Sequence, residues 1–208
     1  MSTEERPQAF KRFVDSVEKP GENFRESVDV ETLLSLEKEE RRAAEELLME
    51  RLLVDDWRAP PALAAAETRG AVMPMQRALP EASGRMKVAI ARALEDLDAI
   101  PKADPIVAEV IREGDEDSGP PAVVAAGQMK SPEIRDALAW ACIHHPTRVV
   151  RVSAGATLLF MAGLTKSPLA LEFRPLIRGL RDDDEATRRA TFAQICHLVG
   201  MPPELADT

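Results

Sequence analysis

The sequence predicts an all-α protein built as a short stack of helix pairs. Apolar residues recur at intervals of three and four positions through most of the 208-residue chain, the period of a helix with one buried face. Aromatic residues make up only 4% of the chain and tyrosine is absent, so the core must consist of Ala, Leu, Val and Ile, which suit closely packed helices. Because these helices are short, each needs similar neighbours to bury its apolar face.

The clearest stretch runs from residue 167 to residue 200. It holds two apolar stripes with helical spacing, one at Phe173, Leu176, Ile177 and Leu180 and the other at Phe192, Ile195, Cys196 and Val199. The acidic residues 182–184 separate the stripes and favour a helix cap, while Gly200 suits a helix end. The segment therefore predicts two short helices joined by an acidic turn.

Residues 1–29 predict an N-terminal arm with one amphipathic helix. Its apolar stripe is Phe10, Phe13, Val14 and Val17, and Pro20-Gly21 stops the helix. This helix is either a cap that docks on the first repeat, which we favour, or a detachable partner-binding motif. Residues 30–200 form the repeat domain, and residues 201–208 form a short tail.

Within the repeat domain, short helices are expected to alternate with turns. The expected pairs are 33–36 with 40–53, 72–79 with 85–97, 106–111 with 122–129, and 131–141 with 147–163. The last pair starts at Ser131, which is expected to cap its first helix before Pro132. The segment from Asp55 to Gly70 is the least regular: Asp56 suits a cap, Pro60-Pro61 suits a first helical turn, and Trp57 is expected to fill the gap as a plug. The Gly- and Pro-rich segment from Gly114 to Pro121 predicts a mobile, non-helical turn that proteases cleave first.

The second helices of the pairs share a pattern when they are overlaid. Each has a small residue near its middle and a long apolar residue four positions later, and the position near the helix start holds Arg41, Lys87, Ala122, Arg151 and Arg188. This pattern resembles the HEAT-repeat family, whose second helix commonly begins Val-Arg-x-x-Ala and ends in Leu. The resemblance covers residues 30–200, is weakest over Asp55 to Gly70, and lacks the basic residue at Ala122.

The resemblance implies a right-handed α-solenoid of about four to five HEAT-like hairpins, with the second helices lining a concave face. Such arrays mostly bind other proteins, so the resemblance does not define one activity. We expect Arg41, Lys87, Arg151 and Arg188 to be structural residues that tie neighbouring repeats. Arg151 and Arg188 in particular are expected to bond to carboxylates of neighbouring turns.

The charge of the chain limits the classes of partner. A formal charge of −9 argues against non-specific nucleic-acid binding and favours a protein partner with a basic surface. No run of about 18 apolar residues predicts a membrane span, and the N-terminal residues do not resemble a signal peptide. Two widely separated cysteines form no disulfide framework, which favours the cytoplasm. Arginine outnumbers lysine, 20 to 7, as in proteins from GC-rich bacterial genomes.

The non-core positions of two second helices are the candidate partner-binding residues. They are Glu45, Glu46, Glu50, Arg92, Glu95 and Asp96. Since most of them are acidic, they either attract a basic partner or only keep a helical face soluble.

The cysteines, the histidines and the two acidic turns hold the side chains with potential for catalysis or metal binding. Adjacent Cys196 and His197 point about 100° apart on a helix, so they are poorly placed to share one metal with Cys142, His144 and His145. Neither acidic turn has the calcium-loop pattern, and no cofactor is expected. We expect Cys196 to belong to the apolar core and the acidic turns to be solvated.

Two hypotheses about function follow. The first is a non-enzymatic binding scaffold, monomeric or weakly oligomeric, such as a bacterial adaptor, inhibitor or immunity-type protein. The second is a HEAT-like lyase that acts on a bilin, although no residue identifies a chromophore pocket. DNA glycosylases of HEAT-like type are disfavoured because their cleft needs basic and aromatic side chains.

Overall fold

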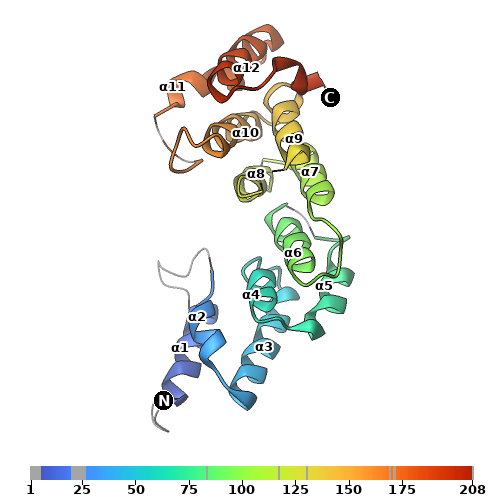
Figure 1. Ribbon diagram of the computed structural model, residues 1–208, viewed down its shortest axis with the longest axis vertical. Helices are drawn as coiled ribbons and strands as arrows, with labels where there is room; N and C mark the ends of the chain where they lie inside the picture. The colour runs from blue at the N-terminus through green and yellow to red at the C-terminus, as the bar shows by residue number, and fades with distance from the viewer. Residues whose placement is uncertain are drawn as a thin grey trace. The chain divides into compact units, whose positions relative to one another are not determined.

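The protein is all-helical, as the sequence predicts. The computed structural model describes residues 6–19, 27–82, 84–116, 118–129, 131–168, 170 and 172–207. These residues form twelve α-helices and three short 3₁₀-helices, and none of them lies in a β-strand (Figure 1). The helices group into two compact units: Met1–Ala82 with Ala89–Ala103, and Ser83–Val88 with Asp104–Thr208.

The first unit contains the N-terminal helices. They are α1 (Arg6–Glu18), α2 (Val30–Ser35), α3 (Lys38–Leu52), α4 (Ala59–Ala65), η2 (Arg69–Ala71), α5 (Val72–Ala78) and the later residues of α6 (Gly84–Asp96). Helix α1 packs against α2 and α3, and α3 also contacts α4 and α5. Phe13 is completely buried and Val17 nearly so, which explains why this helix carries two of the six phenylalanines. The predicted Pro20-Gly21 stop lies outside the described residues.

The irregular segment that follows α3 agrees in part with its prediction. Pro60 and Pro61 lie in the first turn of α4, where proline lacks only an N–H that has no helical partner. The Oδ1 atom of Asp56 accepts a hydrogen bond from the Arg58 N–H just before this helix. Trp57 is half-buried and is therefore not enclosed in the core.

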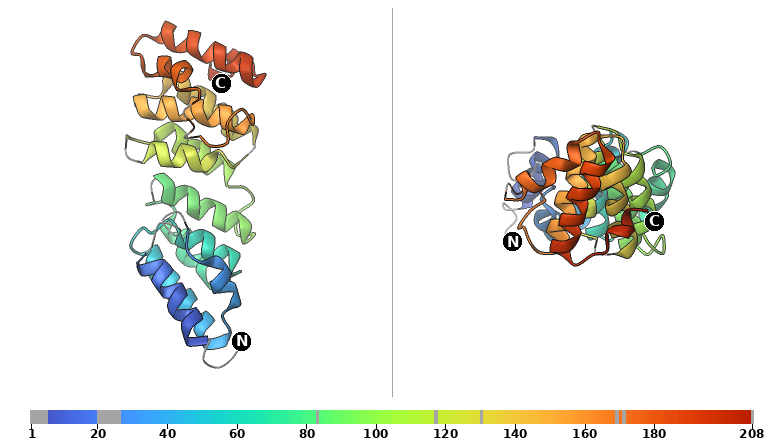
Figure 2. Two further views of the ribbon diagram at one scale, coloured as in Figure 1. Left: turned by 90° about the vertical axis from the view of Figure 1, so that its left-hand side faces the viewer. Right: turned by 90° about the horizontal axis from the view of Figure 1, so that it is seen from above.

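The second unit is a layered arrangement of helix pairs. Its elements after α6 are α7 (Asp104–Glu113), α8 (Gly119–Ala126), α9 (Pro132–His144), α10 (Arg148–Met161), α11 (Arg174–Ile177), η3 (Arg178–Arg181), α12 (Glu185–Val199) and η4 (Pro203–Asp207). Helix α9 packs on α7 and α10 packs on α8, while α12 contacts both α9 and α10 (Figure 2). The core is aliphatic, with Ile134, Leu138 and Ile195 fully buried.

Three predicted helix ends are confirmed by their hydrogen bonds. Ser131 caps α9, since its hydroxyl accepts from the Ile134 N–H at 3.3 Å. Asp184 caps α12 by accepting from the Thr187 N–H at 3.0 Å. Gly200 ends α12 with a φ of 69°, a left-handed conformation that glycine adopts without strain.

The prediction for the turn at Gly114 to Pro121 is wrong in its second half. Helix α8 begins at Gly119, so Pro120 and Pro121 occupy its first turn instead of preventing it. Gly119 packs tightly: an added Cβ there would lie 2.5 Å from a Val150 methyl carbon. Before the helix, Asp115 Oδ1 accepts from the Ser118 N–H at 2.7 Å and orders the turn.

The C-terminal residues are more structured than a tail. Helix η4 packs against α9 and α12, with Ala206 fully buried. The Asp207 carboxylate accepts hydrogen bonds from Arg189 at 2.8 and 3.1 Å. These contacts fasten the end of the described chain to the second unit.

Candidate functional site

The predicted partner-binding residues of α3 divide into an outer pair and an inner residue. Glu46 is 57% exposed and Glu50 is exposed, and the two lie four residues apart on one face of the helix. Glu46 also accepts from Arg42, which is 82% exposed, in a surface pair that contributes little to stability. Glu45 is half-buried instead, and its Oε1 accepts from Arg41 Nε at 2.8 Å.

The three predicted residues of α6 divide in the same way. Arg92 and Asp96 are exposed, whereas Glu95 is half-buried and accepts from the Ala103 N–H at 3.1 Å. Glu45 and Glu95 are therefore engaged in contacts within the chain. The other four side chains are open to solvent on two helices of the first unit.

The predicted structural arginines hold the ends of helices. Arg41, at the start of α3, donates to the Leu33 carbonyl at 2.8 Å and to the Ala66 carbonyl at 3.0 Å. These acceptors lie at the C-terminal ends of α2 and α4, where carbonyl groups carry the negative end of the helix dipole; the Leu33 carbonyl also accepts from the Leu36 N–H at 3.3 Å. Arg41 thus links three helices of the first unit.

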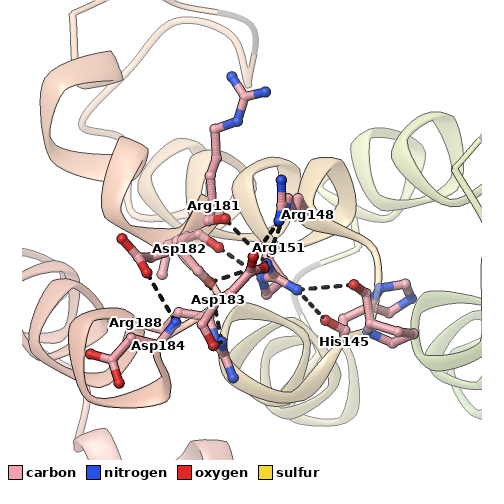
Figure 3. A network of polar contacts seen from close by, with 10 residues as sticks. His145, Arg148, Arg151, Arg181, Asp182, Asp183, Asp184 and Arg188 are labelled. Carbon is pink, nitrogen blue, oxygen red and sulfur yellow. Dashed lines mark hydrogen bonds and ion pairs between the residues drawn. The ribbon is translucent and has the colours of Figure 1, made fainter.

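Arg151 makes the most extensive contacts of this kind, in the second unit (Figure 3). The residue is only 4% exposed, although arginine is almost never buried without partners. Its guanidinium donates to the backbone carbonyls of Leu180, His145, Pro146, Arg181 and Asp182, at 2.7 to 3.4 Å. Arg151 therefore joins the end of α9 to the end of η3.

Arg188 connects the same two regions from α12. Its Nε donates to the Ile143 carbonyl at 2.8 Å, and its Nη1 donates to the carbonyls of Asp182 and Asp183 at 3.1 and 2.8 Å. We expected turn carboxylates as the acceptors of Arg151 and Arg188. The observed acceptors are backbone carbonyls, because the ends of α9 and η3 present them toward both guanidinium groups.

The carboxylates of the turn 182–184 have other partners. Asp183 accepts both hydrogen bonds of an ion pair with Arg148, and this pair lowers the pKa of Asp183. Asp184 accepts from Thr187, which lowers its pKa. Asp182 Oδ1 accepts from the Asp184 N–H at 2.9 Å. Each carboxylate of this turn therefore has a partner within the turn or the helices beside it.

Lys87 differs from the arginines that share its aligned position. Its Nζ donates to Glu109 at 3.2 Å, in a pair whose glutamate is half exposed. A lysine ammonium cannot reach several carbonyls in the way that a guanidinium fork does. Ala122, at the same aligned position, is buried and contributes no donor.

Sequence reasoning missed two further arginines of this type. Arg58 Nη2 donates to the Val17 carbonyl at 3.0 Å near the end of α1, and Arg69 donates to the Leu97 carbonyl just after α6. Neither lies at the aligned position of a second helix, so the repeat pattern did not indicate them. Both lie in the segment from Asp55 to Gly70, where the repeat pattern is weakest.

Both cysteines and His145 are buried, whereas His144 is partly exposed and His197 is exposed. Burial raises the pKa of Cys196 to about 11 and that of Cys142 still higher, so both thiols are protonated at neutral pH. His145 is 1% exposed and its Nδ1 accepts from the Thr147 N–H at 3.0 Å. Among the described residues, no three His, Cys, Asp or Glu side chains are close enough to hold one metal ion.

Comparison with protein-family models, curated proteins and solved structures finds no match to this chain. In the part of the chain that the structure describes, no helix has both the length and the apolar character needed to cross a membrane.

Proposed function

We propose that the helix pairs form a short right-handed α-solenoid of HEAT-like repeats that acts as a non-enzymatic binding module. Support for the repeats comes from Arg41, Arg151 and Arg188, which occupy one aligned position and donate to carbonyls at helix ends. Three of the five aligned positions make the same kind of contact, as repeats would, while Lys87 pairs with Glu109 and Ala122 has no side-chain donor. The proposal further places the protein in the cytoplasm, as a monomer or weak oligomer that does not bind nucleic acid.

The proposed partner is a protein with a basic surface, and the role is that of an adaptor, an inhibitor or an immunity-type protein. The observation that carries this proposal is the exposed acidic row of α3, formed by Glu46 and Glu50 one helical turn apart. Arg92 and Asp96 of α6 are also exposed and would add contacts. Such charges mainly accelerate association and make it sensitive to salt.

The structure indicates which residues to change in the test. Charge reversal at Glu45 would also disturb Arg41 and the helix ends that it holds, so the variant is E46K/E50K. Wild type and variant serve as baits in an extract of the native organism, and the association rate of the recovered partner is then measured. We expect the variant to associate about ten-fold more slowly at low salt, with a smaller difference at about 0.15 M salt.

E81K/E116K is the matched control, because Glu81 and Glu116 are exposed residues of turns and the net charge changes equally. The control should recover the partner as wild type does. Equal binding by E46K/E50K and wild type would remove the α3 row as the binding surface. A coloured covalent adduct after mixing with a bilin would contradict the non-enzymatic function.

A further inference from the structure

A second charged surface lies in the second unit and has the opposite sign. Arg174, Arg178 and Arg181 are exposed along α11 and η3, and together they are called the arginine ridge. Arg174 and Arg178 are four residues apart, which places them on one face of a helical turn. Arg178 and Arg181 are three residues apart in a 3₁₀-helix, where side chains with this spacing lie one above the other. One face of this segment therefore presents three guanidinium groups.

The three guanidinium groups have no carboxylate partner among the described residues, although acids are close in sequence. Of the acidic residues beside the ridge, 182–184 are engaged with Arg148, with Thr187 and with the backbone of their own turn. Glu172, which precedes Arg174 by two residues, is exposed and forms no ion pair with the ridge in the described part of the chain. In Figure 3 the Arg181 side chain extends away from this network. The donors of the ridge are thus free to bond to another molecule.

The backbone beneath the ridge is held in place from inside. Leu180 is fully buried, and Arg151 donates to the carbonyls of Leu180, Arg181 and Asp182. Gly179 lies so close to Thr191 that an added Cβ would be 2.0 Å from its hydroxyl oxygen. A surface carried on a fixed backbone loses less conformational freedom when it binds a ligand.

A shallow, open hollow of about 520 Å³ borders the ridge. It is lined by Pro175, Arg178, Gly179, Arg181 and Asp182. A carboxylate entering it would meet Arg178 and Arg181, and also Asp182, whose Oδ1 already accepts from the Asp184 N–H. The planar guanidinium fork pairs with a carboxylate through two parallel hydrogen bonds.

We propose that the arginine ridge binds an acidic protein segment rich in Asp and Glu. A nucleic acid fits the surface less well, because every nucleotide adds a phosphate and some of these would meet the exposed carboxylates of residues 182–184, whereas a peptide can place uncharged residues beside that turn. The proposal does not depend on the function proposed for the first unit, because the ridge has the opposite charge and lies on other helices.

The test uses the full chain and a rhodamine-labelled peptide of alternating Glu and Gly, with a Gln/Gly peptide as the uncharged probe. Fluorescence anisotropy gives the Kd at low salt for wild type and for R174Q/R178Q/R181Q. We expect the Glu/Gly peptide to bind about ten-fold more weakly to the variant, and the Gln/Gly peptide to bind neither protein. Since the three side chains are exposed, the variant should melt at the wild-type temperature.

R77Q/R112Q/R135Q removes the same charge at arginines outside the ridge and should keep the Kd within about two-fold of wild type. A single R181Q variant should show a smaller loss in the same direction. Equal weakening in the ridge and control variants would overturn the proposal, because binding would then follow net charge alone. Failure of wild type to bind the Glu/Gly peptide, or ridge-dependent binding of a DNA duplex more tightly than of the peptide, would also overturn it.

Discussion

At the scale of single residues, arginine side chains donate to helix-end carbonyls in both units of the protein. In an aliphatic core without tyrosine, few other side chains can satisfy buried carbonyl groups. The arginine guanidinium offers five donors in one plane, which lets Arg151 reach carbonyls from two elements at once. These arginines stabilise the junctions between helices by satisfying acceptors that the helices themselves leave open.

The first prediction concerns Arg151→Ala, which removes the donors of five backbone carbonyls. Charge-assisted hydrogen bonds to buried acceptors contribute about 1.5–3 kcal/mol each when isolated, and these five are not additive. We expect the free energy of unfolding to fall by about 3 kcal/mol and the melting temperature by about 6–12 °C. Circular dichroism during heating measures the melting temperature.

Arg188→Ala should have the same effect at about half the size, because Arg188 is less buried, and should leave partner affinity unchanged. Arg42→Ala, at an exposed surface pair, should change stability by less than about 0.5 kcal/mol. A melting temperature for Arg151→Ala equal to that of Arg42→Ala would contradict the structural role. Lost affinity with unchanged stability in Arg188→Ala would make Arg188 a binding residue.

The second prediction concerns pH and His145. Burial lowers the pKa of His145 from 6.5, and the nearby Arg151 charge adds a smaller lowering. The unfolded chain therefore binds a proton at higher pH than the folded chain does. The stability that the neutral imidazole contributes is complete above about pH 6.5 and decreases as the pH falls below that value.

His145→Asn keeps an acceptor for the Thr147 N–H but does not titrate, so its melting temperature should depend less on pH between 6.5 and 5. Asp29 and Asp56 do not interfere in this range, because their lowered pKa values place their loss of stability below pH 3.8. His197→Gln, at an exposed position, serves as the control and should keep the wild-type pH dependence. The prediction would be contradicted if the melting temperatures of wild type and His145→Asn changed with pH in the same way.

At the scale of elements, small residues decide how closely the helices of the second unit approach. An added Cβ at Gly155 of α10 would lie 2.5 Å from a Leu180 methyl carbon and 3.2 Å from one of Ile195. Gly179 of η3 approaches Thr191 of α12 even more closely. Because Gly155 and Gly179 have no side chain, η3 and α12 can pack this closely against their neighbours.

The third prediction is that Gly179→Ala destabilises the protein. The new methyl group would displace the Thr191 hydroxyl, which donates to the Thr187 carbonyl at 2.9 Å, or would push η3 away from α12. Overpacking of this kind costs about 1–3 kcal/mol. Chemical denaturation followed by circular dichroism measures the change in the free energy of unfolding.

Gly70→Ala provides the matched control for this substitution. No atom lies within 4 Å of an added Cβ at Gly70, and its φ is not in the left-handed region. Alanine there should be neutral or stabilise the protein by about 0.4–1 kcal/mol, because it restricts the unfolded chain. Equal effects of the two substitutions would show that the approach of η3 to α12 is not tight.

At the scale of the whole molecule, two exposed clusters of opposite sign lie on different units. The acidic row of α3 belongs to the first unit and the arginine ridge belongs to the second. The formal charge of −9 conceals this division, because it sums over both units. Two partners of opposite charge could therefore bind one chain.

The fourth prediction separates the two proposed surfaces. E46K/E50K should lose affinity for the basic partner while its Kd for the Glu/Gly peptide stays within about two-fold of wild type. R174Q/R178Q/R181Q should show the reverse pattern, because each surface acts through its own charges. Binding measured at low salt and at about 0.15 M salt checks both proteins. Loss of both activities in either variant would contradict separate surfaces.

The sequence alone determined the all-helical class, most helix boundaries and the capping residues Ser131 and Asp184. These features depend on local physics: the helical period of apolar residues and the side chains that bond to a helix start. The prediction of a non-helical turn from Gly114 to Pro121 is wrong in its second half, because two prolines are equally compatible with a turn and with the first turn of a helix.

Only the tertiary structure decided which polar side chains are internal. Glu45 and Glu46 are adjacent acids on one helix, yet one bonds to Arg41 and the other is exposed. In the same way, Arg151 is buried on helix-end carbonyls while Arg181 extends away from them. The sequence predicted that Arg151 would be structural but not its acceptors, because three of the five carbonyls belong to residues 29 to 31 positions away along the chain. Which elements meet is set by the packing of the whole core, and no local pattern encodes it.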